Sequence, residues 1–214
     1  MKLDVPLIRQ PKDSLDCGIA GLAMILKYHG IDESFEFLKT KISVDSIGTY
    51  APQIGKYLAE KGFDVSIVTM HPKLFTLKDR TLSQEEIITR FNELKESFSV
   101  QDKKVISMFI DFLNTGGKII PKVPSKEDVV EELINKRPVA ALLTTNFLNN
   151  NKPIFNFHFN LITGIDEEYI YVNDPIWDER GGKNKYRISD FFYGLYASAY
   201  GDLDNACLIK IVRR

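Results

Sequence analysis

The chain has 214 residues, of which 44% are hydrophobic and 27% charged, and its formal net charge is −1. This composition is that of an ordinary globular protein, long enough for one sizeable core, and it excludes a chain disordered throughout. The 28 basic and 29 acidic residues create no strong field, so we expect no nucleic-acid partner. No apolar run reaches the roughly 18 residues of a membrane span.

The cysteine content and the first residues bear on cellular setting. Asp4, Pro6 and Arg9 interrupt the N-terminal segment before an apolar region develops, so we expect no signal peptide. Cys17 and Cys207 are too far apart in sequence to indicate a zinc site or a disulfide framework. We therefore expect a reduced, cytoplasmic setting, and neither a metal nor a cofactor.

The first half of the chain is predicted to be mainly helical. A short extended segment over residues 3–9 leads into a polar turn, and the apolar run over residues 17–29 predicts a helix with Asp16 as N-cap and Gly30 beyond its end. This helix is apolar on most faces, so we expect it to be buried. Further helices are expected over residues 34–41, 49–61, 83–97 and 102–114, with a strand over 64–70 and a loop over 71–82.

The second half is predicted to be rich in strands. An amphipathic helix begins at Ser125, and strands are expected over residues 139–145, 157–165, 169–172 and 206–212. Turns or loops are expected over residues 149–153 and 180–185, and a short helix over 188–193. Helices first and strands afterwards, in separate blocks, indicate an α+β fold in a single domain over residues 1–214.

Cys17 is the strongest candidate for chemistry. A thiol in the first turn of a helix lies near unpaired backbone N–H groups and the positive end of the helix dipole, and both stabilise a thiolate. The alternative is that Cys17 is a small core residue, but the polar turn before it favours a position at the helix mouth. Cys207 stands inside an apolar strand, so we interpret it as core.

His158 is the candidate base. Alternation along a strand places His158, Asn160 and Ile162 on one face, where a neutral imidazole facing Cys17 would accept its proton. His29 closes the first helix, about three turns from Cys17, and is too distant. His71 stays open as a second candidate.

Two further residues complete the candidate site. Asp174 follows the second strand of a hairpin whose first strand begins near His158, so its carboxylate is expected to orient the imidazole, with Asn173 as the alternative. Gln10, seven residues before Cys17, is positioned to donate a side-chain N–H to an oxyanion.

These motifs resemble those of a known family. The segments Val5-Pro-Leu-Ile-Arg-Gln10, Asp16-Cys17-Gly18 and His158-Phe-Asn-Leu-Ile, followed by Asn173-Asp174-Pro175, are similar to the blocks of cysteine peptidase family thirty-nine, whose members cleave bacteriocin leaders after a double glycine. The resemblance implies a stand-alone relative with a papain-like fold. In that fold a buried nucleophile helix in an N-terminal helical half packs on a C-terminal antiparallel sheet. It also implies that residues 71–124 are a helical insertion.

The resemblance implies a reaction as well. Cys17 would be the nucleophile, His158 the general base and acid, Asp174 the orienter and Gln10 an oxyanion donor, together with the backbone N–H of Cys17. The expected function is hydrolysis of a peptide or protein substrate through a thioester acyl-enzyme. Two alternatives remain open: an acyltransferase or amide-forming enzyme with the same site, and a catalytically silent peptide-binding module.

Overall fold

The computed structural model describes residues 1–149 and 152–214. The elements of the first half are α1 (Cys17–Tyr28), α2 (Phe35–Lys41), α3 (Ala51–Glu60), β1 (Phe63–Thr69), η1 (Leu77–Thr81), α4 (Gln84–Lys95) and α5 (Val100–Asn114). Those of the second half are β2 (Lys118–Pro121), α6 (Lys126–Ile134), β3 (Val139–Leu143), β4 (His158–Ile165), β5 (Tyr169–Asp174), β6 (Gly182–Arg187), α7 (Ile188–Ala197), η2 (Ser198–Tyr200) and β7 (Cys207–Arg213).

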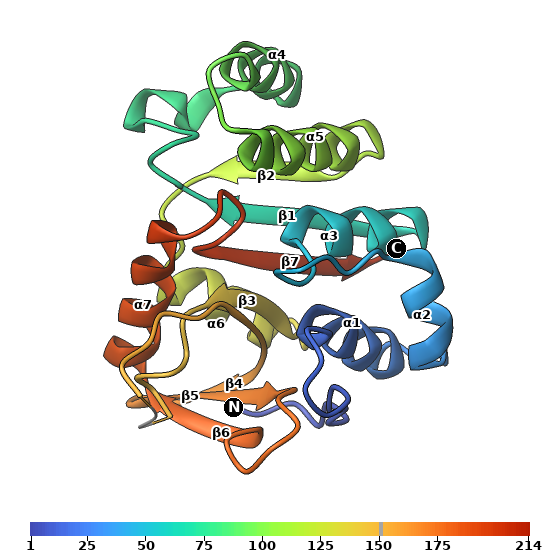
Figure 1. Ribbon diagram of the computed structural model, residues 1–214. Helices are drawn as coiled ribbons and strands as arrows, with labels where there is room; N and C mark the ends of the chain where they lie inside the picture. The colour runs from blue at the N-terminus through green and yellow to red at the C-terminus, as the bar shows by residue number, and fades with distance from the viewer. Residues whose placement is uncertain (150–151) are drawn as a thin grey trace.

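One mostly antiparallel sheet organises the described residues. Its seven strands run in the order β2-β1-β7-β3-β4-β5-β6, and the only parallel pair among them is β1 with β2. The last strand of the sequence, β7, therefore lies in the middle of the sheet, between β1 and β3 (Figure 1). This arrangement confirms the α+β prediction. Strands β1 and β2, which precede α6 in the sequence, also belong to the sheet.

Helices cover both faces of the sheet. On one face α1, α3, α4 and α5 form the larger apolar cluster with Phe159 and Leu161 of β4. On the other face α6 and α7 form a second cluster with Ile162 of β4. The predicted alternation along β4 is confirmed by this division, because neighbouring residues of the strand belong to different clusters.

The helix α1 is buried as predicted. Every residue from Gly18 to Leu26 is buried, and Gly30, beyond the helix end, has φ of +76°. Gly18 is packed so closely that a Cβ atom there would lie 1.9 Å from Oγ1 of Thr49 and 3.0 Å from the Phe159 ring. The absence of a side chain at position 18 thus lets α1 lie directly on β4, with Cys17 at the end of this contact.

Some sequence predictions were wrong. Residues 180–185, predicted as a loop, lie largely in strand β6, and residues 71–82, predicted as a loop, contain η1. Strand β5 extends to Asp174, two residues beyond its predicted end. The short strand β2 was not predicted, and residues 71–124 comprise it together with η1, α4 and α5. Residues 150–151 of the predicted turn over 149–153 lie outside the described part of the chain.

Candidate active site

Cys17 is the first residue of α1 and is partly exposed. Asp16 occupies the N-cap position, as predicted, but its side chain makes no capping hydrogen bond. Its carboxylate instead forms an ion pair with Lys39 at 2.9 Å. The first N–H groups of α1 are therefore left without a side-chain cap, and their positive field acts on the Cys17 sulfur.

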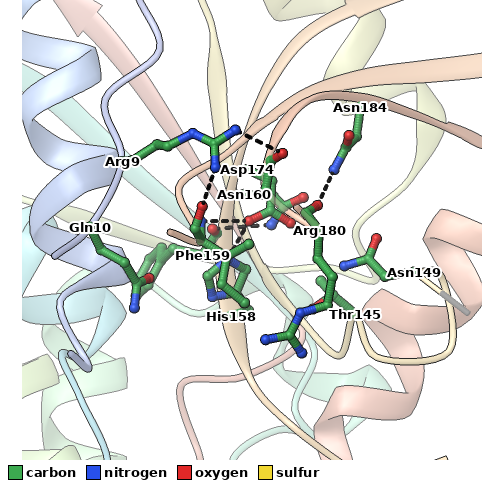
Figure 2. Close-up of polar contacts among 12 residues, drawn as sticks. Arg9, Gln10, Thr145, Asn149, His158, Phe159, Asn160, Asp174, Arg180 and Asn184 are labelled. Carbon is green, nitrogen blue, oxygen red and sulfur yellow. Dashed lines mark hydrogen bonds and ion pairs between the residues drawn. The ribbon is translucent and has the colours of Figure 1, made fainter. Parts of the chain in front are cut away.

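His158 and Asp174 form a buried pair. Nε2 of His158 lies 2.6 Å from Oδ1 of Asp174, and the exposed fractions of the two residues are 5% and 0%. Figure 2 shows the two side chains directed toward one another from neighbouring strands. With Nε2 facing the carboxylate, Nδ1 remains for Cys17, which shares a hydrogen bond with the imidazole. The structure thus brings together three of the predicted residues.

The environment of His158 favours the imidazolium. Burial lowers the pKa of the imidazole, but the charge of Asp174, the hydrogen bond to its carboxylate and the hydrogen bond with Cys17 outweigh burial and raise the pKa to about 10. A cationic imidazole beside a thiol at a helix start stabilises the thiolate form of the sulfur.

The β4–β5 hairpin explains why Asp174 reaches His158. Leu161 is paired with Asn173 across the hairpin, so Asp174 comes beside the start of β4. The turn is closed by Asp166, whose carboxylate accepts N–H bonds from Glu168 at 2.9 Å and Tyr169 at 2.7 Å. Asn173 points elsewhere, since its amide donates to the carbonyl of Val5 at 3.1 Å. Asp174 is therefore the residue that contacts the imidazole.

Gln10 lies in the segment that precedes α1 (Figure 2). It is 8% exposed, and its Nε2 donates one hydrogen bond to the Ser14 carbonyl at 2.5 Å. An amide nitrogen carries two N–H groups, so a second donor remains after this bond is made. The backbone N–H of Gln10 donates to the Pro175 carbonyl at 2.7 Å, which fastens this segment to the turn that follows Asp174.

Arg9 is a contributor that the sequence analysis did not single out. Its Nη1 donates to the carbonyls of Trp177 at 3.0 Å and Asp178 at 2.7 Å, and its Nη2 to that of Gly181 at 3.3 Å. The planar guanidinium thereby holds the loop between β5 and β6. Only its place beside Gln10 distinguished it in the sequence.

The remaining candidates lie away from this group. His29 is the C-cap of α1, and its ring packs on Phe63. The His71 ring accepts a hydrogen bond from the backbone N–H of Lys73 at 3.2 Å, after β1, and also hydrogen-bonds to the backbone of Ala199. Cys207 is fully buried in β7, and burial raises the pKa of its thiol well above the ordinary value, which confirms its interpretation as a core residue.

Two other properties concern the described residues only. Residues 1–149 and 152–214 contain no group of three or more His, Cys, Asp or Glu side chains arranged to hold a metal ion. Within the same ranges, every helix is too short or too polar to cross a lipid bilayer.

Known structures share this fold. A double glycine motif protease from an AMS/PCAT transporter, crystallised in complex with the leader peptide, is 16% identical with a TM-score of 0.50, over 100% of this chain and 94% of that one. The peptidase domain of Streptococcus ComA, a bi-functional ABC transporter involved in a quorum-sensing pathway, is 15% identical with a TM-score of 0.50, over 97% and 98%. At this identity the likeness concerns the fold, which is the papain-like α+β fold of C39 peptidase domains.

Sequence comparison gives the family. No curated protein matches the chain. The model of the Peptidase_C39 like family, however, matches residues 2–202, nearly the whole chain. The chain therefore belongs to the Peptidase_C39 like family of peptidases.

Proposed function

We propose that the protein is a cysteine peptidase in which Cys17, His158 and Asp174 carry out acyl-enzyme chemistry. The observation that supports this proposal is the buried pair of His158 and Asp174, 2.6 Å apart, with Cys17 hydrogen-bonded to the same imidazole. A nucleophile, a base and an orienter in hydrogen-bonding reach of one another are the arrangement that thiol catalysis needs.

The proposed reaction has two halves. The thiolate of Cys17 attacks the carbonyl carbon of a peptide bond, and the developing oxyanion accepts hydrogen bonds from Gln10 and from the backbone N–H of Cys17. The imidazolium of His158 gives its proton to the leaving amine, which departs and leaves a thioester. Water then loses a proton to the neutral imidazole and attacks the thioester, and the acid is released with the thiolate restored.

Asp174 has a supporting role in this scheme. Its Oδ1 also accepts the N–H of Ile176 at 3.0 Å, so the oxygen that faces His158 is held by a second contact. It orients the ring and stabilises the imidazolium, without taking up the proton itself.

The proposed substrate is a peptide or protein. A solved relative is a complex with a leader peptide, which supports a peptide ligand for the present site as well. We also propose the cytoplasm as the setting, since Cys17 and Cys207 are both free thiols.

We further propose that residues 1–214 act as one domain, with residues 71–124 as an insertion that is helical apart from β2. Phe109 and Phe112 of α5 belong to the same apolar cluster as α1, so the insertion shares the main core. At its start α5 reaches the loop before α3, where Gln101 contacts Tyr50 and Lys104 contacts Asp45 at 2.6 Å.

Two measurements test the peptidase proposal. The first follows cleavage of a mixed peptide library by mass spectrometry, with Cys17→Ala as the inactive variant and Cys207→Ala as the matched thiol control. The second follows alkylation of Cys17 by iodoacetamide against pH, in the native protein and in His158→Ala.

We expect Cys17→Ala to abolish cleavage and Cys207→Ala to retain it. We also expect Cys17 to react quickly well below pH about 8.5, the ordinary thiol pKa, and to lose this advantage in His158→Ala. Cleavage by Cys17→Ala, or a Cys17 that reacts like a free thiol, would contradict the proposal. Adding an amine acceptor to the library separates hydrolysis from acyl transfer by the mass of the product.

A further inference from the structure

A small cavity opens beside the thiol of Cys17. Its volume is about 20 Å³, which is room for one group of the size of a water molecule. It lies between the start of α1, the loop before α3 and the loop before β7. Its walls include Cys17, Thr49, Phe157, Asp202, Asp204 and Asn205.

The cavity is acidic and no Lys or Arg lines it, although the charge of Lys73 acts on Asp202 from outside the lining. Asp204 is 2% exposed and Asp202 is half-buried, and no Lys or Arg of residues 1–149 and 152–214 forms an ion pair with either. Burial and the charge of Asp202 raise the pKa of Asp204 to about 7, against the hydrogen bond from Ala51. A cationic group placed here would therefore relieve two carboxylates at once.

A second and independent observation points to a ligand. Oγ1 of Thr49 is buried and lacks a hydrogen-bond partner, and Thr49 lines the cavity. The residue is 8% exposed. Buried polar groups are rarely left unpaired, and a hydroxyl oxygen can accept a hydrogen bond from an ammonium group.

The other walls of the cavity are aromatic. Phe157, Phe159 and Tyr50 also line the cavity. Aromatic faces combined with carboxylates are the surroundings in which proteins bind ammonium groups, since each ring face attracts a cation. The volume of about 20 Å³ admits the ammonium group itself and excludes a long side chain.

We propose that this cavity is a subsite for a primary ammonium group next to Cys17, with Asp204 as its specificity-determining residue. The inference rests on the proposed function, because a cation beside the sulfur is meaningful only if the sulfur reacts. One source of the ammonium is the first residue of a peptide, whose α-nitrogen is two bonds from the carbonyl that Cys17 attacks. The other source is a small free amine that accepts the acyl group in place of water.

Methylammonium is the probe for binding. The rate of Cys17 alkylation by iodoacetamide is measured at a pH on the plateau of the rate profile. There all of the thiol is ionised, so a bound cation can slow the reaction only by blocking access to the sulfur. Sodium chloride keeps the ionic strength constant, and tetramethylammonium is the cation too large for the cavity. The variant Asp204→Asn keeps an oxygen for the Ala51 N–H, now 2.7 Å away, but removes the charge.

We expect methylammonium to slow alkylation in a saturable way and tetramethylammonium to have little effect. The half-saturating methylammonium concentration should rise about tenfold in Asp204→Asn, since a charge-assisted hydrogen bond becomes a neutral one. Asp202→Asn should raise it in the same direction, which keeps the test valid if Asp204→Asn folds poorly. Asp32→Asn, which removes an exposed carboxylate outside the cavity lining, is the control that should leave it unchanged.

Equal protection in the native protein and both variants, equal protection by the two cations, or no protection would each overturn the subsite. These failures are distinguishable from failure of the peptidase proposal, because the rate and pH profile of alkylation without cation report on Cys17 and His158 alone.

Two substrates then separate the sources. Faster release of aminomethylcoumarin from its alanyl than from its N-acetylalanyl derivative supports the first residue of a peptide. Formation of an N-methylamide when methylamine is added supports the free acceptor. Faster release from the N-acetylated derivative without any N-methylamide would contradict both sources and overturn the proposal.

Discussion

The backbone N–H of Gln10 donates a 2.7 Å hydrogen bond to the carbonyl oxygen of Pro175. This bond joins the segment that leads to the Cys17 thiol with the turn that follows the Asp174 carboxylate. The Arg9 side chain reinforces the same junction by binding the carbonyls of Trp177 and Asp178. The positions of Cys17 and Asp174 are therefore coupled through these contacts, although the two residues are far apart in sequence.

Replacing Arg9 by Lys tests this junction. Lysine keeps the positive charge but lacks the planar fork that reaches several carbonyls, so we expect a loss of about 1–2 kcal/mol in the free energy of unfolding. We also expect slower alkylation of Cys17, because the loop after Asp174 is less well held. Urea unfolding and iodoacetamide kinetics measure the two effects, with Arg80→Lys on exposed η1 as control. Unchanged alkylation would show that the clamp serves stability alone.

Replacing Gln10 by Ala tests the oxyanion donor. We expect kcat to fall about 100-fold or more with KM nearly unchanged, since the lost hydrogen bond forms chiefly in the transition state. Alkylation of Cys17 builds no oxyanion, so its rate should stay near that of the native protein. A parallel fall in both rates would mean that Gln10 positions Cys17 rather than stabilising the oxyanion.

Replacing Asp174 by Asn tests the raised pKa of His158. In the native protein the imidazolium persists until pH about 10, so the alkaline limb of the kcat/KM profile should lie there. Without the carboxylate that limb should move toward the ordinary histidine pKa of about 6.5. The pair also stabilises the fold fully below pH about 6.5, and this contribution is lost as pH rises through about 10.

The matching stability measurement is urea unfolding of the native protein and Asp174→Asn at pH 6 and at pH 10. We expect the native protein to be the more stable of the two at the lower pH, with a smaller difference at the higher pH. An alkaline limb at the same position in both proteins would contradict the assignment of the raised pKa to Asp174.

The buried imidazole of His71 leads to a prediction about stability at acidic pH. Burial, with a smaller effect of the Lys73 charge, lowers the pKa of this imidazole to about 4. The unfolded chain binds a proton near pH 6.5, so stability falls as pH drops from about 6.5 toward 4, by about 3 kcal/mol in total. In His71→Gln this part of the acid sensitivity should disappear.

Unfolding free energies at pH 7 and pH 4.5 measure the effect as a difference between the two proteins. His29→Gln is the comparison variant for a half-buried imidazole, whose pKa is lowered by partial burial and by the charge of Arg213. Identical acid sensitivity in His71→Gln and the native protein would contradict a neutral, buried His71.

The parts of the fold that could be predicted are those whose sequence pattern lies within one segment. The apolar run of α1 and the alternating residues of β4 are patterns that one segment displays by itself, and the turn at Asp166 fixes the hairpin that brings Asp174 to His158. The candidate site could be assembled from these segments because each of its residues stands at the end of an element.

The parts that were missed depend on partners distant in sequence. Strand β6 is an edge strand whose Lys183 and Lys185 are directed to solvent, so it lacks the apolar alternation of an inner strand. Strand β2 has four residues and pairs only with β1. The Arg9 clamp consists of bonds to backbone carbonyls, which no pattern of side chains reveals.

The central place of β7 in the sheet has a consequence for folding during synthesis. Residues of β7 bridge β1 on one side and β3 on the other, so the two parts of the sheet are joined through the last strand of the sequence. During synthesis the sheet cannot close until this strand has left the ribosome. Cys17 is synthesised early, but the sheet that carries His158 and Asp174 is complete only when β7 pairs with β1 and β3.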